Sequence, residues 1–344
     1  MGKHYSLGID VGSVSTNIVA IDDNLNVAEK LYLRTCGRPI DALKAGMGRL
    51  INMLGDDALI DACGTTGSGR HLAGVMIGAD VVKNEITSHA VASCHTVPDV
   101  RTVLEIGGQD SKIILVRDGV VFDFAMNTVC AAGTGSFLDR QAERLGIPIS
   151  EFGGYALRSK SPVRIAGRCA VFAESDMISK QQTGHSSEDI IAGLCEAMVR
   201  NYLCNLAKGK KIEDPVIFQG GVAANVGIAA AFEKALVKKV IIPQHYDVMG
   251  AYGAAILANE QMSMTDAKTR FCGFDAINDE FSAKSFECAD CANMCEVVQL
   301  LSNGKTIAHW GDRCGKWDGQ SVCVEKVRGK EEVNEKHTVS ITNY

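Results

Sequence analysis

The stretch Ile9-Asp10-Val11-Gly12-Ser13-Val14-Ser15-Thr16-Asn17-Ile18-Val19 decides the fold, because it aligns without gaps on Leu104-Glu105-Ile106-Gly107-Gly108-Gln109-Asp110-Ser111-Lys112-Ile113-Ile114, at an offset of 95 residues. In this alignment an acid meets an acid, a glycine meets a glycine and a hydroxyl residue meets a hydroxyl residue. Each copy has a β-rich run that ends in an acid, a glycine turn and a second β-rich run. The repeat predicts two β-hairpins on two duplicated α/β domains, each contributing one loop to a shared cleft.

Outside the hairpins, the spacing of apolar residues predicts strands that alternate with helices. In the first copy we expect a strand at 27–35, a helix at 39–54, a strand at 58–63 and a helix at 84–96. In the second copy we expect a strand on each side of the Arg117-Asp118-Gly119 turn and helices near 134–145, 173–182 and 187–207. Two βα units follow, one from a strand at 216–219 into a helix starting near Ala223, the other from a strand at 240–242 into a helix at 247–259.

The length and the change of pattern beyond residue 262 predict more than one domain. A chain of 344 residues is too long for one small core. We predict a first subdomain at 1–97 plus 248–262, a second subdomain at 98–247 and a Cys-rich tail at 263–344. The polar stretch 326–344 is expected to be frayed.

Composition excludes several classes of partner. Hydrophobic residues make up 46% of the chain and charged residues 22%, and the net charge is -6. No basic run appears, which argues against nucleic acid. No signal core and no stretch of roughly 20 apolar residues appears, so we expect no membrane contact and a cytoplasmic location. In that compartment the 13 cysteines are expected to be reduced thiols or metal ligands, with Cys63, Cys94, Cys195 and Cys204 as small buried hydrophobes.

The two hairpins carry the chemistry needed to hold a polyphosphate and a hydrated divalent metal. Glycines let backbone amides approach phosphate oxygens, and carboxylates orient waters bound to Mg²⁺. The strand that runs into Gly220 and Gly221 would let an adenosine lie against the backbone, with a helix N-terminus beyond it. The candidate residues for metal and water are Asp10, Glu105 and Gln109. The candidate nucleotide contacts are Gly12, Ser13, Val14, Ser15, Thr16, Gly107, Gly108, Asp110, Ser111, Lys112, Gly133, Thr134, Gly220, Gly221, Val222 and Asn225.

Cys130 and Cys169 lie in polar, glycine-rich settings that are unusual for buried cysteines. Cys130 stands in Asn127-Thr128-Val129-Cys130-Ala131-Ala132-Gly133-Thr134-Gly135-Ser136, and Cys169 in Ala166-Gly167-Arg168-Cys169-Ala170. A [4Fe-4S] cluster needs four thiolates, and this region offers two per chain. A twofold dimer that shares one cluster is the simplest way to complete the set. The alternative is that both are ordinary core cysteines of a small-molecule (sugar) kinase, with Glu105 or Asp110 as the base.

The order of the motifs resembles that of the actin, sugar-kinase and Hsp70 ATPase superfamily. More narrowly, Glu105–Lys112, Asn127–Gly135 and Gly167-Arg168-Cys169 resemble the activators of 2-hydroxyacyl-CoA dehydratases and benzoyl-CoA reductases, the BadF/BadG/BcrA/BcrD ATPase family. The resemblance covers roughly residues 5–262. It implies an α/β fold with duplicated actin-like (ribonuclease H-like) ATPase domains, to which this chain adds a small Cys-rich C-terminal tail.

The same resemblance implies a function. It implies an oxygen-sensitive homodimer that binds ATP or ADP with Mg²⁺ in each subunit and holds one [4Fe-4S] cluster through Cys130 and Cys169. Such a protein hydrolyses ATP and passes a low-potential electron to an acceptor iron-sulfur enzyme, a dehydratase or a related reductase. The donor would be a ferredoxin or flavodoxin. An actin-like or chaperone-like ATPase would share the nucleotide cleft but would leave both cysteines unexplained.

Three further features bear on these expectations. A helix N-terminus after Cys130 and the neighbouring Arg168 would stabilise the more negative reduced cluster, and Thr134 and Ser136 would shape the surroundings of the cluster. Glu85 and His89 lie one helical turn apart and are expected to form a surface or interdomain hydrogen-bond pair rather than a metal site.

The tail has a spacing typical of metal ligands. Four thiols stand at Cys288, Cys291, Cys295 and Cys314, and Cys272 and Cys323 are spare candidates. The spacing leaves structural zinc and a second iron-sulfur cluster open. A free-cysteine tail is the alternative. Similar Cys-rich segments appear in longer relatives of the family.

Overall fold

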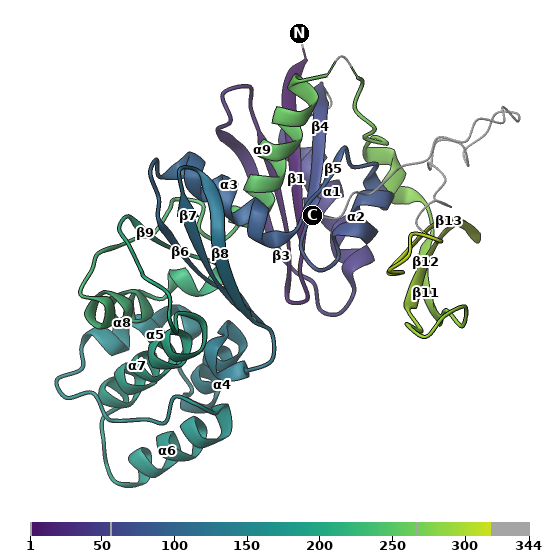
Figure 1. The fold of residues 1–344 in the computed structure, drawn as a ribbon. Coiled ribbons are helices and arrows are strands. Elements are labelled where there is room, and N and C mark those ends of the chain that lie inside the picture. The colour runs from purple at the N-terminus through teal and green to yellow at the C-terminus, as the bar shows by residue number, and fades with distance from the viewer. Residues whose placement is uncertain (1, 56, 266, 318–344) are drawn as a thin grey trace, which may run out of the picture. The chain divides into compact units, whose positions relative to one another are not determined.

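The computed structural model describes residues 2–55, 57–265 and 267–317, and within these the chain forms two compact units (Figure 1). Unit 1 takes the chain up to Glu85 and from Gly250 onward, and unit 2 takes Ile86–Met249. The helix at Glu85–Thr96, which the sequence assigns to the first subdomain, therefore falls with unit 2 from Ile86 on. In the described part of the chain no helix combines the length and the apolar character needed to cross a bilayer.

Unit 1 is built on a five-stranded mixed sheet with the order β3-β2-β1-β4-β5. Its strands are β1 (Lys3–Val11), β2 (Ser15–Ile21), β3 (Val27–Arg34), β4 (Ala58–Thr66) and β5 (Val81–Val82), and its helices are α1 (Pro39–Leu54), α2 (Arg70–Ile77) and α9 (Met249–Ser263). Leu7 and Ile9 of β1 pack in one core with Leu43 of α1 and Leu72 of α2. Gly8, which points to the opposite face, lies so close to α9 that an added Cβ would stand 1.9 Å from the Ala251 carbonyl oxygen. Helices therefore cover both faces of this sheet.

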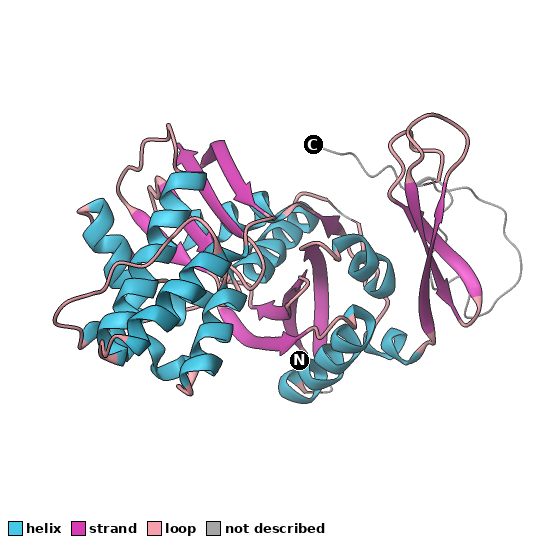
Figure 2. Ribbon diagram, turned by 90° about the horizontal axis from the view of Figure 1, so that it is seen from below, coloured by secondary structure: helices cyan, strands magenta, loops and turns pink. Residues whose placement is uncertain are grey.

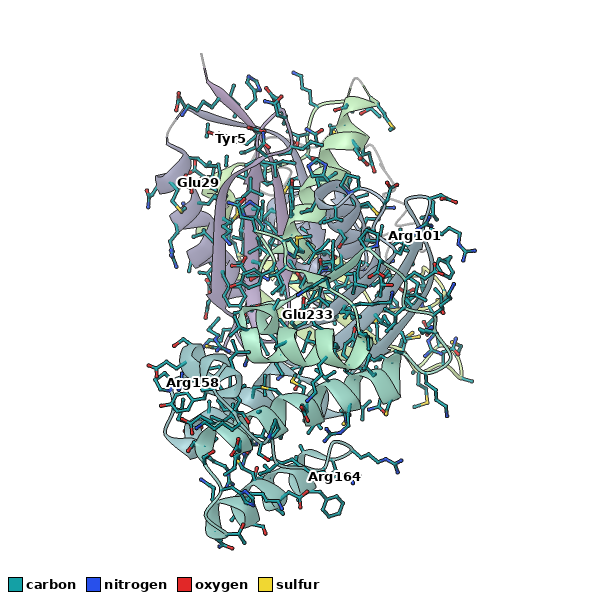
Figure 3. All side chains as sticks on the ribbon, turned by 90° about the vertical axis from the view of Figure 1, so that its left-hand side faces the viewer. Tyr5, Glu29, Arg101, Arg158, Arg164 and Glu233 are labelled. Atoms are coloured by element: carbon teal, nitrogen blue, oxygen red, sulfur yellow. The ribbon has the colours of Figure 1, made fainter. Side chains whose placement is uncertain are left out.

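Unit 2 repeats this plan with a sheet of the order β10-β9-β6-β7-β8. Its strands are β6 (Thr102–Ile106), β7 (Ser111–Arg117), β8 (Val120–Asn127), β9 (Val216–Gln219) and β10 (Val240–Ile241). Its helices are α3 (Glu85–Thr96), α4 (Gly135–Leu145), α5 (Ile149–Leu157), α6 (Ala170–Gln182), α7 (Ser187–Leu206) and α8 (Val226–Leu236), with short 3₁₀ turns η1 (Ala131–Gly133) and η2 (Gly221–Ala224). Leu104 and Ile113 pack on the α5, α7 and α8 side, and Val103 and Ile114 pack on the α3 side. Figure 3 shows Arg158 and Arg164 at the surface, on the connection between α5 and α6.

The two predicted hairpins are confirmed, with the same register in each. Asp10 pairs with Asn17 in β1–β2, and Glu105 pairs with Lys112 in β6–β7. Each turn is closed by the same backbone bond, because the Gly12 amide donates to the Ser15 carbonyl at 2.8 Å and the Gly107 amide donates to the Asp110 carbonyl at 3.0 Å. The strand orders also correspond, with β8-β7-β6-β9-β10 of unit 2 matching β3-β2-β1-β4-β5 of unit 1.

The described part of the tail is a three-stranded antiparallel meander, which belongs to unit 1. It consists of a 3₁₀ turn η3 (Phe274–Asn278) and the strands β11 (Phe281–Glu287), β12 (Glu296–Ser302) and β13 (Lys305–Trp310) (Figure 2). Phe281, Leu300 and Ile307 join the same core as α1. The Lys44 ammonium of α1 donates to the Asp279 carbonyl at 2.6 Å. The base of the meander is thus anchored on α1. Cys323 and the stretch 326–344 lie outside the described residues.

A buried carboxylate ties the start of the tail to the unit 1 sheet. Asp80 accepts hydrogen bonds from the Cys63 amide at 2.8 Å, the Arg270 amide at 2.7 Å and the Thr269 hydroxyl at 2.7 Å. Hydrogen bonds to a charged group are stronger than those between neutral groups, so this clamp fixes the segment that follows α9.

The expectation of four buried cysteines is correct for two of them. Cys63 and Cys195 are fully buried, and burial raises the pKa of Cys195 to about 12, which keeps it an unreactive thiol. Cys94 is half-buried, and Cys204 is exposed on α7, so the apolar pattern around it was misleading.

Candidate functional site

The unit 1 hairpin presents its turn to solvent but turns one predicted contact inward. Ser13 at the apex is exposed, and Gly12, Val14 and Ser15 are partly exposed. Thr16 is buried, and its hydroxyl lies 3.0 Å from the Thr35 hydroxyl, which donates to the Gly12 carbonyl at 2.9 Å. The Thr16 side chain therefore braces the turn from behind, and a phosphate would be approached by backbone amides and the serine hydroxyls.

A second loop of unit 1, Gly67-Ser68-Gly69, lies against the acid of this hairpin, and sequence reasoning missed it. The Gly69 amide donates to the Val11 carbonyl at 2.8 Å, and a Cβ added at Gly67 would stand 2.4 Å from Asp10 Oδ1. The stretch Gly64-Thr65-Thr66-Gly67-Ser68-Gly69 leads from a strand through glycines into α2. That strand–glycine loop–helix pattern is a signal from which the loop could have been found. Asp10 therefore lies between two glycine turns.

The unit 2 hairpin buries a three-residue charge network. Lys112 Nζ lies 3.1 Å from Glu105 Oε2 and 2.8 Å from Asp110 Oδ2, with the Lys112 and Glu105 side chains almost fully buried. Glu105, predicted to organise metal and water, and Lys112, predicted to contact the nucleotide, thus form an ion pair with each other, and both roles stay predictions. Gln109 at the turn apex is exposed. Ser111 Oγ is buried and has no partner in the described structure, which leaves one hydroxyl under the turn for a ligand or water.

The loop after β9 comes close to Glu105. Gly220 has φ +88°, and a Cβ there would stand 2.4 Å from the Ile106 carbonyl oxygen and 2.7 Å from Glu105 Oε1. Only glycine allows this backbone conformation and this approach. Val222 is buried, so only the backbone of this residue is available to a ligand. Asn225 caps α8 by accepting from the Gly227 amide at 3.0 Å, so the helix begins at Val226 rather than near Ala223.

The N-terminus of α4 is hydrogen-bonded to the unit 2 hairpin. The Gly135 amide donates to the Gly107 carbonyl at 2.8 Å, and the Ser136 amide donates to the Gly108 carbonyl at 2.9 Å. The Ser136 hydroxyl also donates to the Gly108 carbonyl, at 2.7 Å. These donors were expected to point at the cysteine, but the hairpin carbonyls occupy them. Helix α6 instead has its N-terminus at a cysteine, because Cys169 is its N-cap residue.

Cys130 and the segment before Cys169 lie on adjacent loops of unit 2. Cys130 Sγ lies 3.9 Å from the Arg168 carbonyl oxygen and 3.8 Å from Asn201 Nδ2. Asn201 of α7 also donates to the Gly167 carbonyl at 2.5 Å. The Asn127 side chain accepts from the Cys130 amide and donates to the Cys130 carbonyl, both at 2.8 Å. The backbone of Cys130 is thus clamped, while its thiol is partly exposed.

Exposed apolar side chains flank both cysteines. Val129 is 94% exposed, Val171 is 69% exposed and Phe172 is 66% exposed. Large apolar side chains at such exposure are typical of a surface that a partner covers. In the described residues no group of three or more His, Cys, Asp or Glu side chains is arranged to hold a metal ion. Neither the two-cysteine site nor the four tail cysteines therefore forms a closed metal shell within the chain as described.

His89 is buried beside the β9 loop rather than exposed on the helix surface. Its Nδ1 lies 2.9 Å from Gln219 Nε2, and Gln219 Oε1 accepts from the Ser93 hydroxyl at 2.9 Å. Burial, and then the charge of Lys112, lowers the pKa of His89 to about 3. A neutral imidazole therefore supports the residue that precedes Gly220.

We predict a pH dependence of stability from His89. The pKa of His89 is about 3 in the folded protein and about 6.5 in the unfolded chain, so the folded state binds fewer protons between these two pH values. The contribution of His89 to stability is therefore fully present above pH 6.5 and is lost as the pH falls toward 3. One such group lowers the free energy of unfolding by up to about 1.4 kcal/mol per pH unit in this window. Urea titrations of the wild type and of His89→Gln, with the exposed His185→Asn as control, measure it. An unchanged slope in His89→Gln would contradict the assignment.

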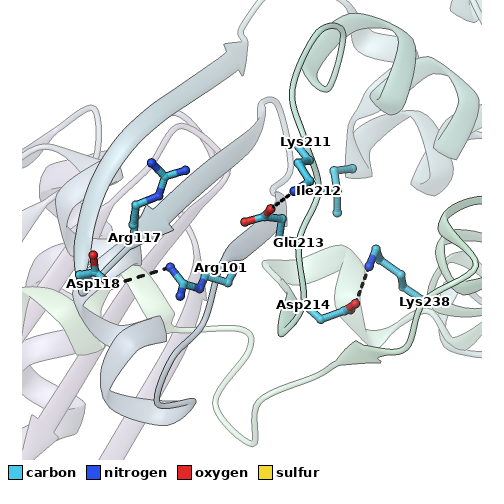
Figure 4. Close-up of a pocket in the computed structure, with 8 residues that line it drawn as sticks. All are labelled: Arg101, Arg117, Asp118, Lys211, Ile212, Glu213, Asp214 and Lys238. Carbon is cyan, nitrogen blue, oxygen red and sulfur yellow. Dashed lines mark hydrogen bonds and ion pairs between the residues drawn. The ribbon is translucent and has the colours of Figure 1, made fainter.

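A separate open pocket of about 610 Å³ lies at the other end of the unit 2 sheet (Figure 4). Six of its seven charged side chains form ion pairs, as in Arg101 with Asp118 at 3.9 Å and Lys238 with Asp214. Lys211 pairs with Glu213 in the same way. The seventh, Arg117, lies over the Phe122 ring, so the lining carries one net positive charge, and the pocket holds none of the predicted site residues.

Comparison with known proteins is consistent with this geometry. Residues 7–258 match the model of the BadF/BadG/BcrA/BcrD ATPase family. Over 260 residues the chain is 35% identical to the (R)-2-hydroxyglutaryl-CoA dehydratase activating ATPase of Acidaminococcus fermentans, covering 74% of this chain and 96% of the relative. It is 36% identical, also over 260 residues, to the activator of lactoyl-CoA dehydratase of Anaerotignum propionicum, covering 74% and 98%.

A solved structure of an activator has the same fold. The activator of the 2-hydroxyisocaproyl-CoA dehydratase from Clostridium difficile with bound ADPNP superposes with a TM-score of 0.68 at 30% identity, covering 76% of this chain and 96% of that one. The fold is that of the actin-like ATPases. The family match ends at residue 258, so the β11–β13 meander lies beyond it. The chain belongs to the BadF/BadG/BcrA/BcrD ATPase family, whose similar members named here are activators of 2-hydroxyacyl-CoA dehydratases.

Proposed function

We propose that this protein is an ATP-hydrolysing reductase that delivers a low-potential electron to a partner iron-sulfur enzyme of the 2-hydroxyacyl-CoA dehydratase or benzoyl-CoA reductase type. It works as a homodimer of duplicated actin-like domains, takes its electron from a ferredoxin or flavodoxin, and is oxygen-sensitive. The single observation that carries the proposal is that the phosphate hairpin of unit 2 is hydrogen-bonded to the segment that carries Cys130.

The nucleotide part rests on the hairpins, the Gly220 loop and the relatives. Each turn, at Gly12 in unit 1 and at Gly107 in unit 2, offers backbone amides to a phosphate, and Asp10 and Gln109 are the groups proposed to orient a hydrated Mg²⁺ or the attacking water. Glu105 acts from behind the turn through its ion pair with Lys112. A relative of the same family has been solved with a bound ATP analogue.

The cluster part rests on the chemistry of the donors. Cys130 and Cys169 are partly exposed, on adjacent loops, and flanked by exposed Val129, Val171 and Phe172. One chain supplies two of the four thiolates that a [4Fe-4S] cluster needs, so these residues fit a cluster shared across a twofold interface. When bound, the cluster supplies one-electron redox chemistry. The Asn201 amide is placed to donate an N–H···S bond to Cys130, and the N-terminus of α6 at Cys169 favours negative charge there.

The coupling part follows the hydrogen bonds from one site to the other. A phosphate bound at the Gly108 and Gln109 amides would pull on the two peptide units whose carbonyls, those of Gly107 and Gly108, hold the first turn of α4. Cys130 lies five residues before Gly135, and the Asn127 side chain clamps it to the end of β8. A change of nucleotide therefore reaches Cys130 through α4 and η1. ATP selects the electron-donating arrangement only to the extent that it binds this arrangement more tightly than ADP does.

Single-turnover electron transfer tests this function. The anaerobic, dithionite-free reduced protein is mixed with a purified 2-hydroxyacyl-CoA dehydratase, and its visible absorption is followed with ATP, with ADP or without nucleotide. We expect rapid reoxidation only when both the acceptor and ATP are present. Reoxidation at the same rate with ATP, with ADP and without nucleotide would overturn the proposal. A colourless protein that phosphorylates a sugar in a metabolite screen would favour the kinase alternative.

A further inference from the structure

We propose that the open end of the β11–β13 meander is a tetrathiolate site for one zinc-type divalent ion, formed by Cys288, Cys291, Cys295 and Cys314. This site is independent of the nucleotide and cluster sites of the proposed function. Cys288, Cys291 and Cys295 lie between β11 and β12, and Cys314 lies just after β13. In an antiparallel meander these two segments emerge at the same end, opposite the Asn303-Gly304 turn.

A backbone hydrogen bond closes the connection between β11 and β12, on which Cys288, Cys291 and Cys295 lie. The Cys288 amide donates to the Cys295 carbonyl at 2.8 Å, which continues the β11–β12 ladder one pair beyond Glu287 and Glu296. Cys288 and Cys295 are therefore direct cross-strand neighbours, with Cα atoms about 5.5 Å apart. Their side chains therefore start from the same face of the hairpin, as two ligands of one tetrahedral zinc with bonds of about 2.3 Å would have to do.

Contacts between the two segments bring Cys314 to the same place. The Trp317 indole N–H donates to Cys288 Sγ at 3.5 Å, and Lys316 forms an ion pair with Asp290. Gly311 has φ +106°, and a Cβ there would stand 2.6 Å from the Glu296 carbonyl oxygen, so the chain leaves β13 tight against β12.

The two cysteine-bearing segments have few apolar residues of their own, so a bound ion would stabilise them. The apolar residues of the meander pack at its base, where Phe281, Leu300 and Ile307 join the unit 1 core. At the open end, Phe286 packs on Trp317 at 5.0 Å between ring centroids, and the Cys291 and Cys314 side chains are exposed. Short polar loops of this kind gain order from a metal cross-link. The four thiols do not converge in the described structure, so the site closes as the ion binds.

One ion is preferred to a second iron-sulfur cluster because the run departs from the bacterial ferredoxin signature after its first pair. The Cys288-x₂-Cys291 pair occurs in zinc sites and in that signature alike, but the separations from Cys291 to Cys295 and from Cys295 to Cys314 are both longer than those of the ferredoxin run. The Lys316 ammonium then lies beside a site with four thiolates and a net charge of −2, which it partly neutralises. Such a site stiffens the meander and carries no electron.

Cobalt substitution in the full-length chain tests the site. In Cys130→Ser, which cannot share a cluster, Co²⁺ alone is expected to bind at about one equivalent per chain with the intense visible bands and thiolate-to-metal charge-transfer bands of a tetrahedral tetrathiolate, and Zn²⁺ is expected to bleach them. Adding Cys291→Ser and Cys314→Ser, both at exposed positions, removes the bands. Adding Cys204→Ser, at an exposed cysteine of α7, leaves them unchanged.

The proposed zinc-type site would be wrong if Cys130→Ser gave no cobalt bands, or if the bands persisted after Cys291→Ser and Cys314→Ser were added. It would also be wrong if the tail gave an iron-sulfur spectrum after anaerobic purification. Nucleotide affinity, measured in every variant, shows that the ATPase units remain folded. Because the test is read in chains without Cys130, its failure leaves the reductase proposal standing, and failure of the reductase proposal leaves the tail site standing.

Discussion

Replacing Cys130 by serine is expected to abolish electron transfer to the acceptor and to leave a colourless protein that still binds nucleotide. A serine hydroxyl has nearly the shape of the thiol but is a far weaker ligand for iron. The loss should exceed the roughly 10–100-fold that the removal of an outer-shell partner costs. The Asn127 clamp on the backbone of residue 130 does not involve the thiol, so the loop is expected to keep its shape. Iron content, visible spectra and ADP affinity are the measurements.

The matched variants are Cys169→Ser and Cys204→Ser. Cys169→Ser should reproduce the loss, because Cys169 is proposed as the second ligand from the same chain. Cys204→Ser should behave as wild type, because Cys204 is an exposed cysteine of α7 with no proposed role. A Cys130→Ser protein that retained the colour and the ATP-dependent electron transfer would remove the basis for a shared cluster.

Replacing Gly220 by alanine is expected to weaken nucleotide binding by about a hundredfold. The new Cβ would stand 2.4 Å from the Ile106 carbonyl oxygen at φ +88°, so the loop must move away from β6 and from Glu105. Strain at such a position costs about 1–3 kcal/mol, and about 2.7 kcal/mol corresponds to two decades in Kd. Titration with a fluorescent ADP analogue measures the change.

Gly209→Ala separates strain from contact. Gly209 also has a positive φ of +75°, but a Cβ there meets nothing within 4 Å. This variant should lose some stability from its backbone conformation and should bind nucleotide as wild type does. If Gly220→Ala bound ADP normally, the β9 loop would not be part of the nucleotide site.

Local sequence signals were sufficient for most elements of the two sheets. The hairpins followed from the repeat of an acid, a glycine and a hydroxyl residue, and α1 began at Pro39, where proline is favoured in a first helical turn. α5 was missed because Gly153 and Gly154 stand in its centre, and α2 was missed because Gly74 interrupts it and Gly69 and Gly78 flank it. Both helices are stabilised by packing on a core, which local propensity does not show.

The tail strands and the details of the site depended on tertiary structure. β11 carries Ala283, Lys284 and Ser285 in its centre, and their exposure hides the alternation that marks a strand. The motif around Thr16 predicts a hydroxyl near phosphate, but the side chain points inward because Thr35 of the next segment offers a partner. The first amides of α4 likewise donate to the Gly107 and Gly108 carbonyls, because the β6–β7 turn offers these acceptors. These contacts join residues 19 or more apart in sequence.

Iron and sulfide analysis, with native mass, of anaerobically purified Cys291→Ser/Cys314→Ser protein tests the central claim most directly, because the tail thiols can then contribute no shell of their own. The account predicts a brown dimer with about four irons and four sulfides, which is two of each per chain. A monomer without iron, after incubation with iron and sulfide and in the presence of ATP, would contradict it.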